Sequence, residues 1–210
     1  MRIPSQLFRF YSSQGLRVAL YAYLRWRLCP FEEVEKYVPN EGKIIDVGCG
    51  YGLLANFLTL RSNKRDVTGI DLSVRRIRAA QETTDSRRNI RFKLMNVLDL
   101  ELREPDAVVM SDFLHHIDYQ SQEEVLIHCY QKLSPRGSLI CQEVDNRPLW
   151  KYWFAFLIDR ILNVGERQFF RSRQGLQELL QRIGFSVKIK KVDKHLPAAD
   201  VLFICKKEKQ

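Results

Sequence analysis

Residues 44–52 read Ile-Ile-Asp-Val-Gly-Cys-Gly-Tyr-Gly, an apolar run that leads into three glycines at alternate positions. The apolar run predicts a buried strand over residues 43–47, and the residues after the glycines predict a helix over 53–61. Glycines between a strand and a helix let the backbone pass close beneath a nucleotide ligand. This stretch therefore predicts the first strand, loop and helix of an α/β sheet, with a ligand site at the loop.

The same alternation continues along the chain. Strands are predicted over residues 67–70, 90–94, 107–110 and 138–144, and helices over 74–82, 122–133 and 173–183. Alternating strands and helices form a parallel sheet covered on both faces. The last two predicted strands, 187–192 and 201–205, are joined by too short a link for a parallel crossover, so they must pair antiparallel. The predicted fold class is α/β: a seven-stranded, mostly parallel sheet with an antiparallel last strand, helices on both faces and an N-terminal helical cap.

Two segments lie outside this alternation. Residues 1–41 are predicted to be helical and to form an N-terminal cap on a core that spans residues 42–210. Residues 145–171 form an aromatic insertion, longer than the usual link between a strand and a helix. We expect both segments to fold over the carboxyl end of the sheet and to form a pocket with an aromatic lining: Trp150, Trp153, Phe154 and Trp26.

Composition restricts the class of protein. The chain has 45% hydrophobic and 28% charged residues, and no apolar run approaches the roughly 20 residues of a membrane-spanning helix. Its five cysteines include no Cys-x-x-Cys pair, which argues against a disulfide framework and a zinc site, so we expect no metal site. No secretion signal is recognised. The expected location is a reducing cytoplasm, with peripheral contact at a membrane as an alternative.

The net charge of +9 favours anionic partners. Three classes are compatible with it: an acidic carrier protein, an anionic membrane surface and, less favoured, nucleic acid. Scattered Lys and Arg side chains also serve solubility alone, so the charge by itself does not choose among these interpretations.

The spacing of the glycines distinguishes between ligands. A dinucleotide site has the pattern Gly-x-Gly-x-x-Gly, which seats a pyrophosphate on a helix N-terminus. Here the third glycine is Gly52, and Leu53 occupies the dinucleotide position. Asp46 also precedes the first glycine, Gly48, by two residues, and a carboxylate there suits a cationic ligand better than a pyrophosphate.

The pattern Asp46-x-Gly48-x-Gly50-x-Gly52 resembles the first motif of the class I, or Rossmann-like, S-adenosylmethionine-dependent methyltransferases. Residues 67–73, Val-Thr-Gly-Ile-Asp-Leu-Ser, resemble the second motif of that family. By this resemblance Asp71 holds both ribose hydroxyls, for which a carboxylate is well suited. The alternative is that Asp71 only places a negative charge at a helix N-terminus.

Two further stretches resemble motifs of the family and occur in the same order along the chain. Residues 92–97 resemble the third motif, but Met95 stands in place of a glycine and Asn96 in place of an acid that accepts from the adenine amino group. The carbonyl oxygen of Asn96 is able to accept in the same way. Residues 106–117 resemble the fourth strand and the loop beyond it, which border the methionine moiety. The resemblance covers roughly residues 41–145.

The resemblance implies S-adenosyl-L-methionine as cofactor and S-adenosyl-L-homocysteine as product. Cys49 is interpreted as a small filler beside the glycines rather than as a nucleophile. Arg27 either pairs with the methionine carboxylate or lies solvated on the surface. The implied cofactor-binding residues are these: Asp46, Gly48, Cys49, Gly50, Asp71, Leu72, Asn96, Val97, Ser111, Asp112 and Arg27.

Methyl transfer needs alignment above all, and an acceptor with a hydroxyl or an acidic carbon also needs a base. His116 and His115 are the candidate bases, because the ordinary pKa of imidazole, about 6.5, lies close to operating pH. Glu143 and Asp145 are alternatives, and the histidine pair is also compatible with a purely structural role.

The expected function is methyl transfer to oxygen or carbon of a small, apolar, aromatic or lipid-like acceptor. One alternative is a methyltransferase that acts on RNA or protein, which Lys188, Lys190 and Lys191 favour. Residues 111–114 lack the Pro-Pro-aromatic and Pro-Cys motifs of base methylation. A second alternative is a scaffold that binds the cofactor without turnover.

Overall fold

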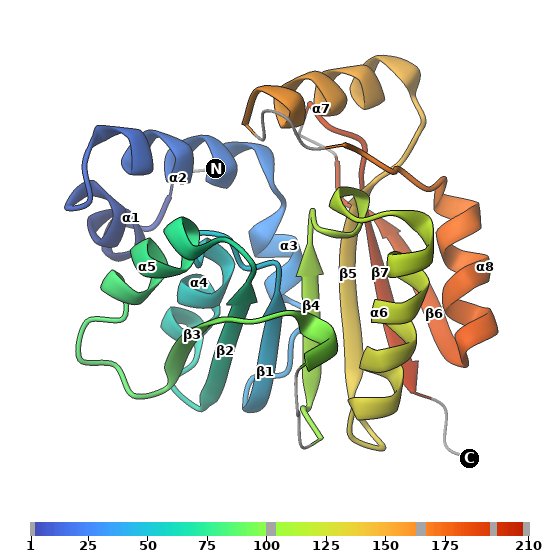
Figure 1. The fold of residues 1–210 in the computed structure, drawn as a ribbon, viewed down its shortest axis with the longest axis horizontal. Coiled ribbons are helices and arrows are strands. Elements are labelled where there is room, and N and C mark those ends of the chain that lie inside the picture. The colour runs from blue at the N-terminus through green and yellow to red at the C-terminus, as the bar shows by residue number, and fades with distance from the viewer. Residues whose placement is uncertain (1–2, 100–103, 163–166, 194–196, 208–210) are drawn as a thin grey trace.

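The computed structural model describes residues 3–99, 104–162, 167–193 and 197–207. Its strands form one sheet in the order β3-β2-β1-β4-β5-β7-β6 (Figure 1). β7 runs antiparallel to both β5 and β6, and the other neighbouring strands pair in parallel. This arrangement confirms the predicted fold class. The strand bounds are β1 Gly42–Val47, β2 Arg65–Asp71, β3 Ile90–Leu94, β4 Ala107–Ser111, β5 Ser138–Val144, β6 Phe185–Lys191 and β7 Asp200–Lys207.

The helices of the sheet begin and end at residues that suit their termini. Side chains of Ser73 and Ser172 accept hydrogen bonds at the starts of α5 and α8, and Gly184 ends α8 with a left-handed backbone. The Asp118 side chain accepts from two backbone amides, so α6 begins three residues before the predicted position, residue 122. The helices are α1 Ser5–Ser12, α2 Leu16–Leu28, α3 Phe31–Glu35, α4 Leu53–Arg61, α5 Val74–Glu82, α6 Tyr119–Lys132, α7 Leu149–Leu162 and α8 Arg173–Ile183.

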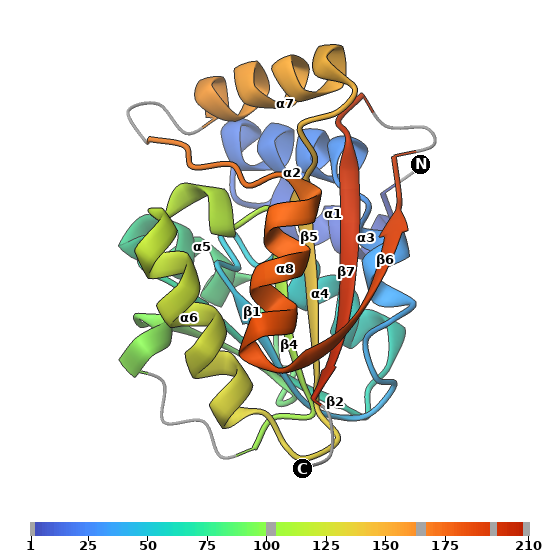
Figure 2. The same ribbon diagram turned by 90° about the vertical axis from the view of Figure 1, so that its right-hand side faces the viewer.

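Helices lie on both sides of the sheet (Figure 2), and each face of the sheet has its own hydrophobic layer. Because side chains alternate along a strand, Val109 of β4 packs in one layer while Val108 and Met110 pack in the other. Helices α1 to α5 contribute to the first layer, and α6 and α8 contribute to the second. Both faces are therefore covered, as a largely parallel sheet requires.

The three N-terminal helices pack into the first layer. Trp26 of α2 lies edge-on to Phe57 of α4, with ring centroids 4.9 Å apart, and is 1% exposed. The Tyr11 hydroxyl accepts from the side-chain amide of Asn56, 3.0 Å away. Residues 1–41 and the sheet thus share one interior. Trp26 was expected to line the acceptor pocket, and this expectation is wrong because burial against the core is the more favourable place for its indole.

The aromatic insertion contains α7, which lies over the same end of the molecule as α2 (Figures 1 and 2). Of the predicted range 145–171, residues 163–166 lie outside the described part of the chain. Among the helices that are described, none combines the length and the hydropathy needed to cross a membrane.

Candidate active site

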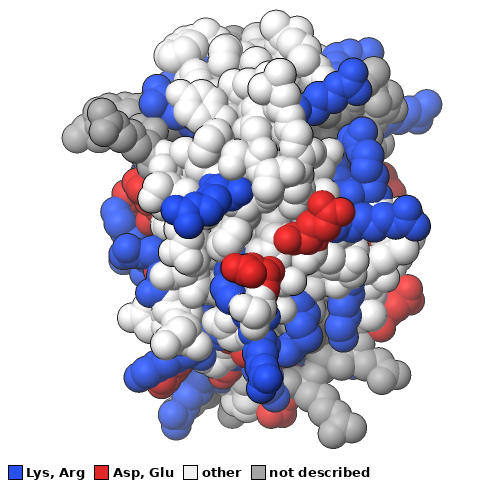
Figure 3. Space-filling model, turned by 90° about the vertical axis from the view of Figure 1, so that its left-hand side faces the viewer, with Lys and Arg blue, Asp and Glu red and all other residues white. Residues whose placement is uncertain are grey.

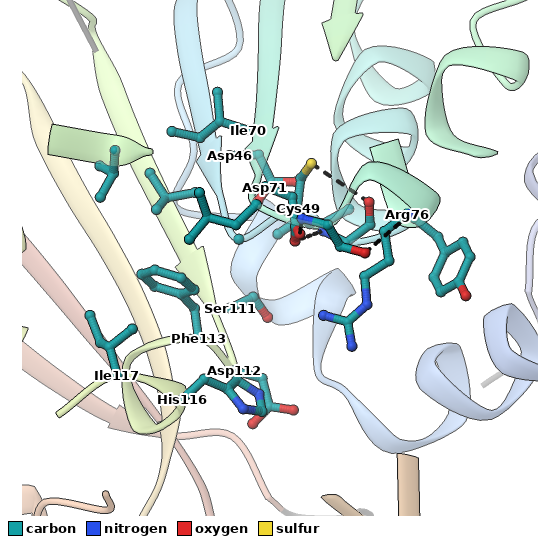
Figure 4. A pocket seen from close by; sticks show the side chains of 18 of the residues that line it. Asp46, Cys49, Ile70, Asp71, Arg76, Ser111, Asp112, Phe113, His116 and Ile117 are labelled. Atoms are coloured by element: carbon teal, nitrogen blue, oxygen red, sulfur yellow. Dashed lines mark hydrogen bonds between the residues drawn. The ribbon is translucent and has the colours of Figure 1, made fainter. Parts of the chain in front are cut away.

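A cavity of about 580 Å³ opens at the carboxyl ends of β1, β2 and β4 (Figure 4). Strands β2 and β3 follow β1 along the chain and lie on one side of it in the sheet. Strands β4 and β5 come later in the chain and lie on the other side. Where the strand order reverses in this way, the loops diverge and leave a crevice in which α/β proteins bind ligands. The cavity therefore lies where the topology places a ligand site.

The glycine loop between β1 and α4 forms one wall of the cavity. Gly48, Gly50 and Gly52 all have positive φ, 69°, 54° and 78°, which a residue with a side chain adopts only under strain. A Cβ on Gly48 would lie 2.2 Å from the ring of Phe113, whereas a Cβ on Gly50 would meet only open space. The loop thus presents bare backbone to the cavity at Gly50.

Asp71 at the end of β2 supports this loop. Its Oδ2 accepts from the Gly50 backbone N–H at 2.9 Å, and its Oδ1 accepts from the Ser73 N–H at 2.8 Å. Each carboxylate oxygen keeps a second lone pair, so Asp71 is able to accept two further hydrogen bonds from a ligand diol.

Asp46 is a buried carboxylate in the wall of the cavity. The residue is 2% exposed and lines the cavity, and among the described residues its Oδ2 has no hydrogen-bond partner. Burial raises the pKa of Asp46 to about 7, against a hydrogen bond from the Ala55 backbone that favours the ionised form. An unsatisfied buried acceptor beside a cavity calls for a ligand that donates.

Most of the other expected cofactor residues also line the cavity. Burial, with the nearby Asp46 and Asp71 charges, raises the pKa of the Cys49 thiol, which fits its interpretation as an inert filler. Ser111 donates to the side chain of Gln142 at 2.6 Å, so its hydroxyl is held in place. The cavity brings together these expected residues: Asp46, Gly48, Cys49, Gly50, Asp71, Leu72, Asn96, Val97, Ser111 and Asp112.

Arg27 lies elsewhere. It is exposed on α2 and is absent from the cavity lining, whereas Arg25 of the same helix lines the cavity together with Tyr21, one turn earlier. Sequence reasoning did not single out Arg25 or Arg76, whose guanidinium extends into the cavity (Figure 4). The four-residue spacing of Tyr21 and Arg25 was the signal available for the first of these.

The two histidines occupy different places. His116 lines the cavity, but His115 is 2% exposed and lies behind it, with its ring stacked on Phe170 at 4.6 Å. His115 Nδ1 is 2.7 Å from Glu143 Oε2, and the other oxygen of Glu143 accepts from the Phe113 and Leu114 backbone amides. Glu143 therefore holds both the His115 ring and the turn that carries the two histidines.

Asp112 completes this network. It pairs with Arg25, and its Oδ1 lies 3.8 Å from His115 Nδ1. Asp112, His115 and Glu143 place ligand atoms within 4.8 Å of one another, a grouping that a divalent cation could use. In the described structure the carboxylates of that group are engaged by Arg25 and by backbone amides.

The tryptophans of the insertion lie outside this cavity. Trp150 and Trp153 are 64% and 60% exposed and contribute nothing to its lining, contrary to expectation. Phe154 lines a separate small cleft between α2 and α7. The aromatic rings that do line the main cavity are Tyr21, Phe31, Tyr51 and Phe113.

Comparison with known proteins agrees with this fold and site. Residues 20–188 match a family model described as a methyltransferase domain, so the chain belongs to that family. It is similar to the mitochondrial ubiquinone biosynthesis O-methyltransferase of Saccharomyces cerevisiae, with 29% identity over 129 residues, 59% of this chain and 40% of that protein. The corresponding enzyme of Chromobacterium violaceum is 35% identical over 99 residues, 45% of this chain and 41% of that protein. The chain thus spans about half or less of the length of these relatives.

Solved structures share the fold. An S-adenosylmethionine-dependent methyltransferase from Mesorhizobium loti has a TM-score of 0.67 at 17% identity, over 84% of this chain and 96% of that one. An O-methyltransferase family protein from Burkholderia thailandensis has a TM-score of 0.74 at 19% identity, over 96% of this chain and 62% of that one. The family predicted from the motifs is confirmed.

Proposed function

We propose that the protein transfers a methyl group from S-adenosyl-L-methionine to oxygen or carbon of a small, apolar, aromatic or lipid-like acceptor. The observation that carries this proposal is one cavity wall that combines the buried carboxylate of Asp46, whose Oδ2 lacks a partner among the described residues, with the bare backbone of Gly50 and the carboxylate of Asp71. When bound, the cofactor supplies an electrophilic methyl group. S-adenosyl-L-homocysteine is the corresponding product.

The residues present fit that cofactor. Asp46 would accept from the ammonium group, Gly50 would let the ligand approach the backbone, and Asp71 would accept from the ribose hydroxyls. Asn96 and Val97, which also line the cavity, would hold the adenine. Two guanidinium groups that line the cavity, those of Arg25 and Arg76, are placed to attract the carboxylate, and we assign them the role expected of Arg27.

His116 is the residue we assign as general base. It lines the cavity on the turn beyond β4, opposite the glycine loop (Figure 4). A hydroxyl acceptor bound between the two would bring its proton to the imidazole. His115 reaches no part of this cavity, so we assign it a positioning role, in which Glu143 fixes its ring and the turn beside it.

The acceptor class is supported by the lining and by similarity. Apolar and aromatic side chains surround the part of the cavity near His116, including Phe113, Ile117 and Val125. The relatives named above are ubiquinone biosynthesis O-methyltransferases. An apolar aromatic acceptor with a hydroxyl suits both observations.

Ligand binding and turnover test the proposal in two stages. S-adenosyl-L-homocysteine should raise the melting temperature, since a ligand at 100 times its Kd adds about 2.7 kcal/mol of stability. Stabilisation by NAD in its place would overturn the cofactor assignment. Turnover should appear with quinol or aryl hydroxyl acceptors. Turnover with RNA, together with RNA binding that weakens steeply as salt rises, would favour a nucleic-acid methyltransferase, and binding without any turnover would favour a scaffold.

A further inference from the structure

Helix α7 presents an apolar stripe to solvent. Its inner residues, Phe154 and Ile158, line the cleft toward α2. Its outer side carries five large hydrophobic residues, each more than half exposed: Leu149, Trp150, Trp153, Leu157 and Ile161. Helices of globular proteins normally expose a polar face opposite the buried one, so α7 is apolar where a partner-free helix would be charged.

Helix α2 carries a second stripe of the same kind. Leu16, Leu20 and Tyr23 are 85%, 53% and 43% exposed, and their spacing of four and three residues places them on one side of the helix. The two helices are neighbours, because both line the small cleft that contains Leu28 and Phe154. The two stripes, named here the α2–α7 face, therefore lie at one end of the molecule.

Exposed arginines lie on both helices of the α2–α7 face. Residues 1–31 contain no Asp or Glu but include five arginines: Arg2, Arg9, Arg17, Arg25 and Arg27. Of these, Arg17 and Arg27 are exposed on α2, and Arg160 is exposed on α7. Figure 3 shows an area free of charged side chains at the upper end of the molecule, with Lys and Arg on both sides of it and a few Asp or Glu side chains at its lower edge.

We propose that the α2–α7 face docks on an anionic lipid bilayer. Tryptophan and tyrosine favour the boundary between lipid and water, and aliphatic side chains beside them enter the acyl region. Exposed arginines at the border then meet lipid phosphates. A second copy of the chain suits this face less well, because a two-fold interface would bring Arg17, Arg27 and Arg160 toward arginines of the same face.

Docking at this face would bring the cavity to the membrane. Arg25 lines both the main cavity and the small cleft beneath α7, so the cavity and the α2–α7 face lie at the same end of the sheet. An apolar acceptor could then pass from the bilayer to the site without crossing water. This last step rests on the proposed function, whereas docking itself does not.

Vesicle binding tests the docking without any use of activity. The full chain should co-sediment with vesicles of equal parts phosphatidylcholine and phosphatidylglycerol, far less with phosphatidylcholine alone, and less as salt rises. Two of the three tryptophans, Trp150 and Trp153, lie on the face, and Trp26 is buried. Tryptophan emission should therefore move to shorter wavelength on binding.

Matched variants locate the contact. Trp153→Ser combined with Leu157→Ser should weaken binding to the anionic vesicles by about tenfold or more, and Arg17→Glu by about fivefold or more. Ile127→Ser on α6 and Arg136→Glu, both exposed away from the face, should bind as the unchanged protein does. Melting temperatures and stabilisation by S-adenosyl-L-homocysteine should be retained in all four.

Three results would overturn the proposal: no binding to anionic vesicles at low salt, equal binding by the Trp153→Ser/Leu157→Ser variant, or a dimer in sedimentation velocity that this variant dissociates. The last result would assign the face to a second copy of the chain. Because stabilisation by the cofactor product is measured separately, failure of docking and failure of the proposed function give different results.

Discussion

Arg25 of α2 forms an ion pair with Asp112 beyond the end of β4, and so joins the N-terminal helices to the sheet beside the cavity. The two side chains are 16% and 13% exposed. Burial opposes the ionisation of Asp112, but the positive charge of Arg25, aided by His115, lowers the pKa of that carboxyl to about 2. The pair is thus a charged contact that is largely buried from solvent.

Replacement of Arg25 should lower the stability of the protein. Arg25→Met leaves Asp112 buried without its partner, and the free energy of unfolding should fall by about 3 kcal/mol near neutral pH, measured by chemical denaturation. A double variant, Arg25→Met with Asp112→Asn, should recover part of the loss. Because the pKa of Asp112 is lowered, the pair's contribution is present above the ordinary pKa of an aspartate and is lost as pH falls toward about 2. Arg27→Met, two residues further along α2 and exposed, is the control; an equal loss there would contradict the assignment.

The affinity for S-adenosyl-L-methionine should depend on pH through Asp46. The pKa of Asp46 is raised to about 7, so its carboxyl gains a proton below that value and then accepts the cofactor's ammonium group poorly. Affinity should fall by up to about tenfold for each pH unit below this point. Calorimetric titrations on both sides of neutrality measure it. Asp46→Asn should bind more weakly and with a flat pH profile; a profile unchanged in that variant would assign the titration to another group.

Asp71 should matter for the cofactor more than for the fold. Asp71→Asn keeps one acceptor oxygen but loses the charge, and cofactor affinity should fall by about 1.5–3 kcal/mol, the range for hydrogen bonds to charged groups. Calorimetry measures the affinity and a thermal melt measures the loop's contribution to stability. Asp66→Asn, on the same strand but exposed, serves as control. Normal affinity in a folded Asp71→Asn variant would show that the ribose lies elsewhere.

His116 should control the rate rather than cofactor binding. If it takes the acceptor proton, His116→Ala should lower turnover by about 10²–10⁴-fold at nearly unchanged cofactor affinity, and the fall of the rate at acidic pH should disappear from the variant's profile. His128→Ala on α6 is the control. A loss below tenfold with the acidic limb intact would leave His116 without a role as base and would indicate an acceptor that needs none.

His115 and Glu143 call for a different readout. Glu143→Gln keeps the shape of the side chain but weakens its hold on His115 and on the backbone amides of the turn. We expect a smaller fall in kcat than for His116→Ala. The fall of the rate at acidic pH should remain, but its midpoint should move to a different pH. A profile identical to that of the unchanged protein would limit Glu143 to a structural role.

The sequence predicted the bounds of helices and strands best where a single local signal specifies them. The bounds of β3, β5, α4, α5 and α8 agree with prediction because strand periodicity, serine caps and glycine stops specify them locally. The start of α6 was missed because the Asp118 cap had not been recognised. The N-terminal region was predicted as helical, but no separate helix was predicted for α1, which Gly15, with a positive φ of 96°, separates from α2.

The site was predictable as far as its motifs extend. Asp46, the glycines and Asp71 are adjacent to strand ends, so order along the chain places them in space. The inner position of Arg25 depends on which side of α2 faces the sheet, and the α2 pattern contains apolar residues on several sides. The outward position of Trp153 could not be predicted for the same reason, since α7 is apolar all round and periodicity gives no direction.

The fully buried Arg65 of β2 contacts residues on both sides of the expected boundary at residue 41. It pairs with Glu35 at 2.9 Å, and its guanidinium donates to the backbone oxygens of Val38 and Pro39. Removing residues 1–41 would take these acceptors away from the Arg65 guanidinium. It would also expose the hydrophobic layer against which Trp26 packs. Unfolding should accordingly be cooperative across the boundary, with a single transition seen by every probe. The N-terminal helices then behave as part of the folding unit, and their exchange for those of another protein would require Arg65 to change with them.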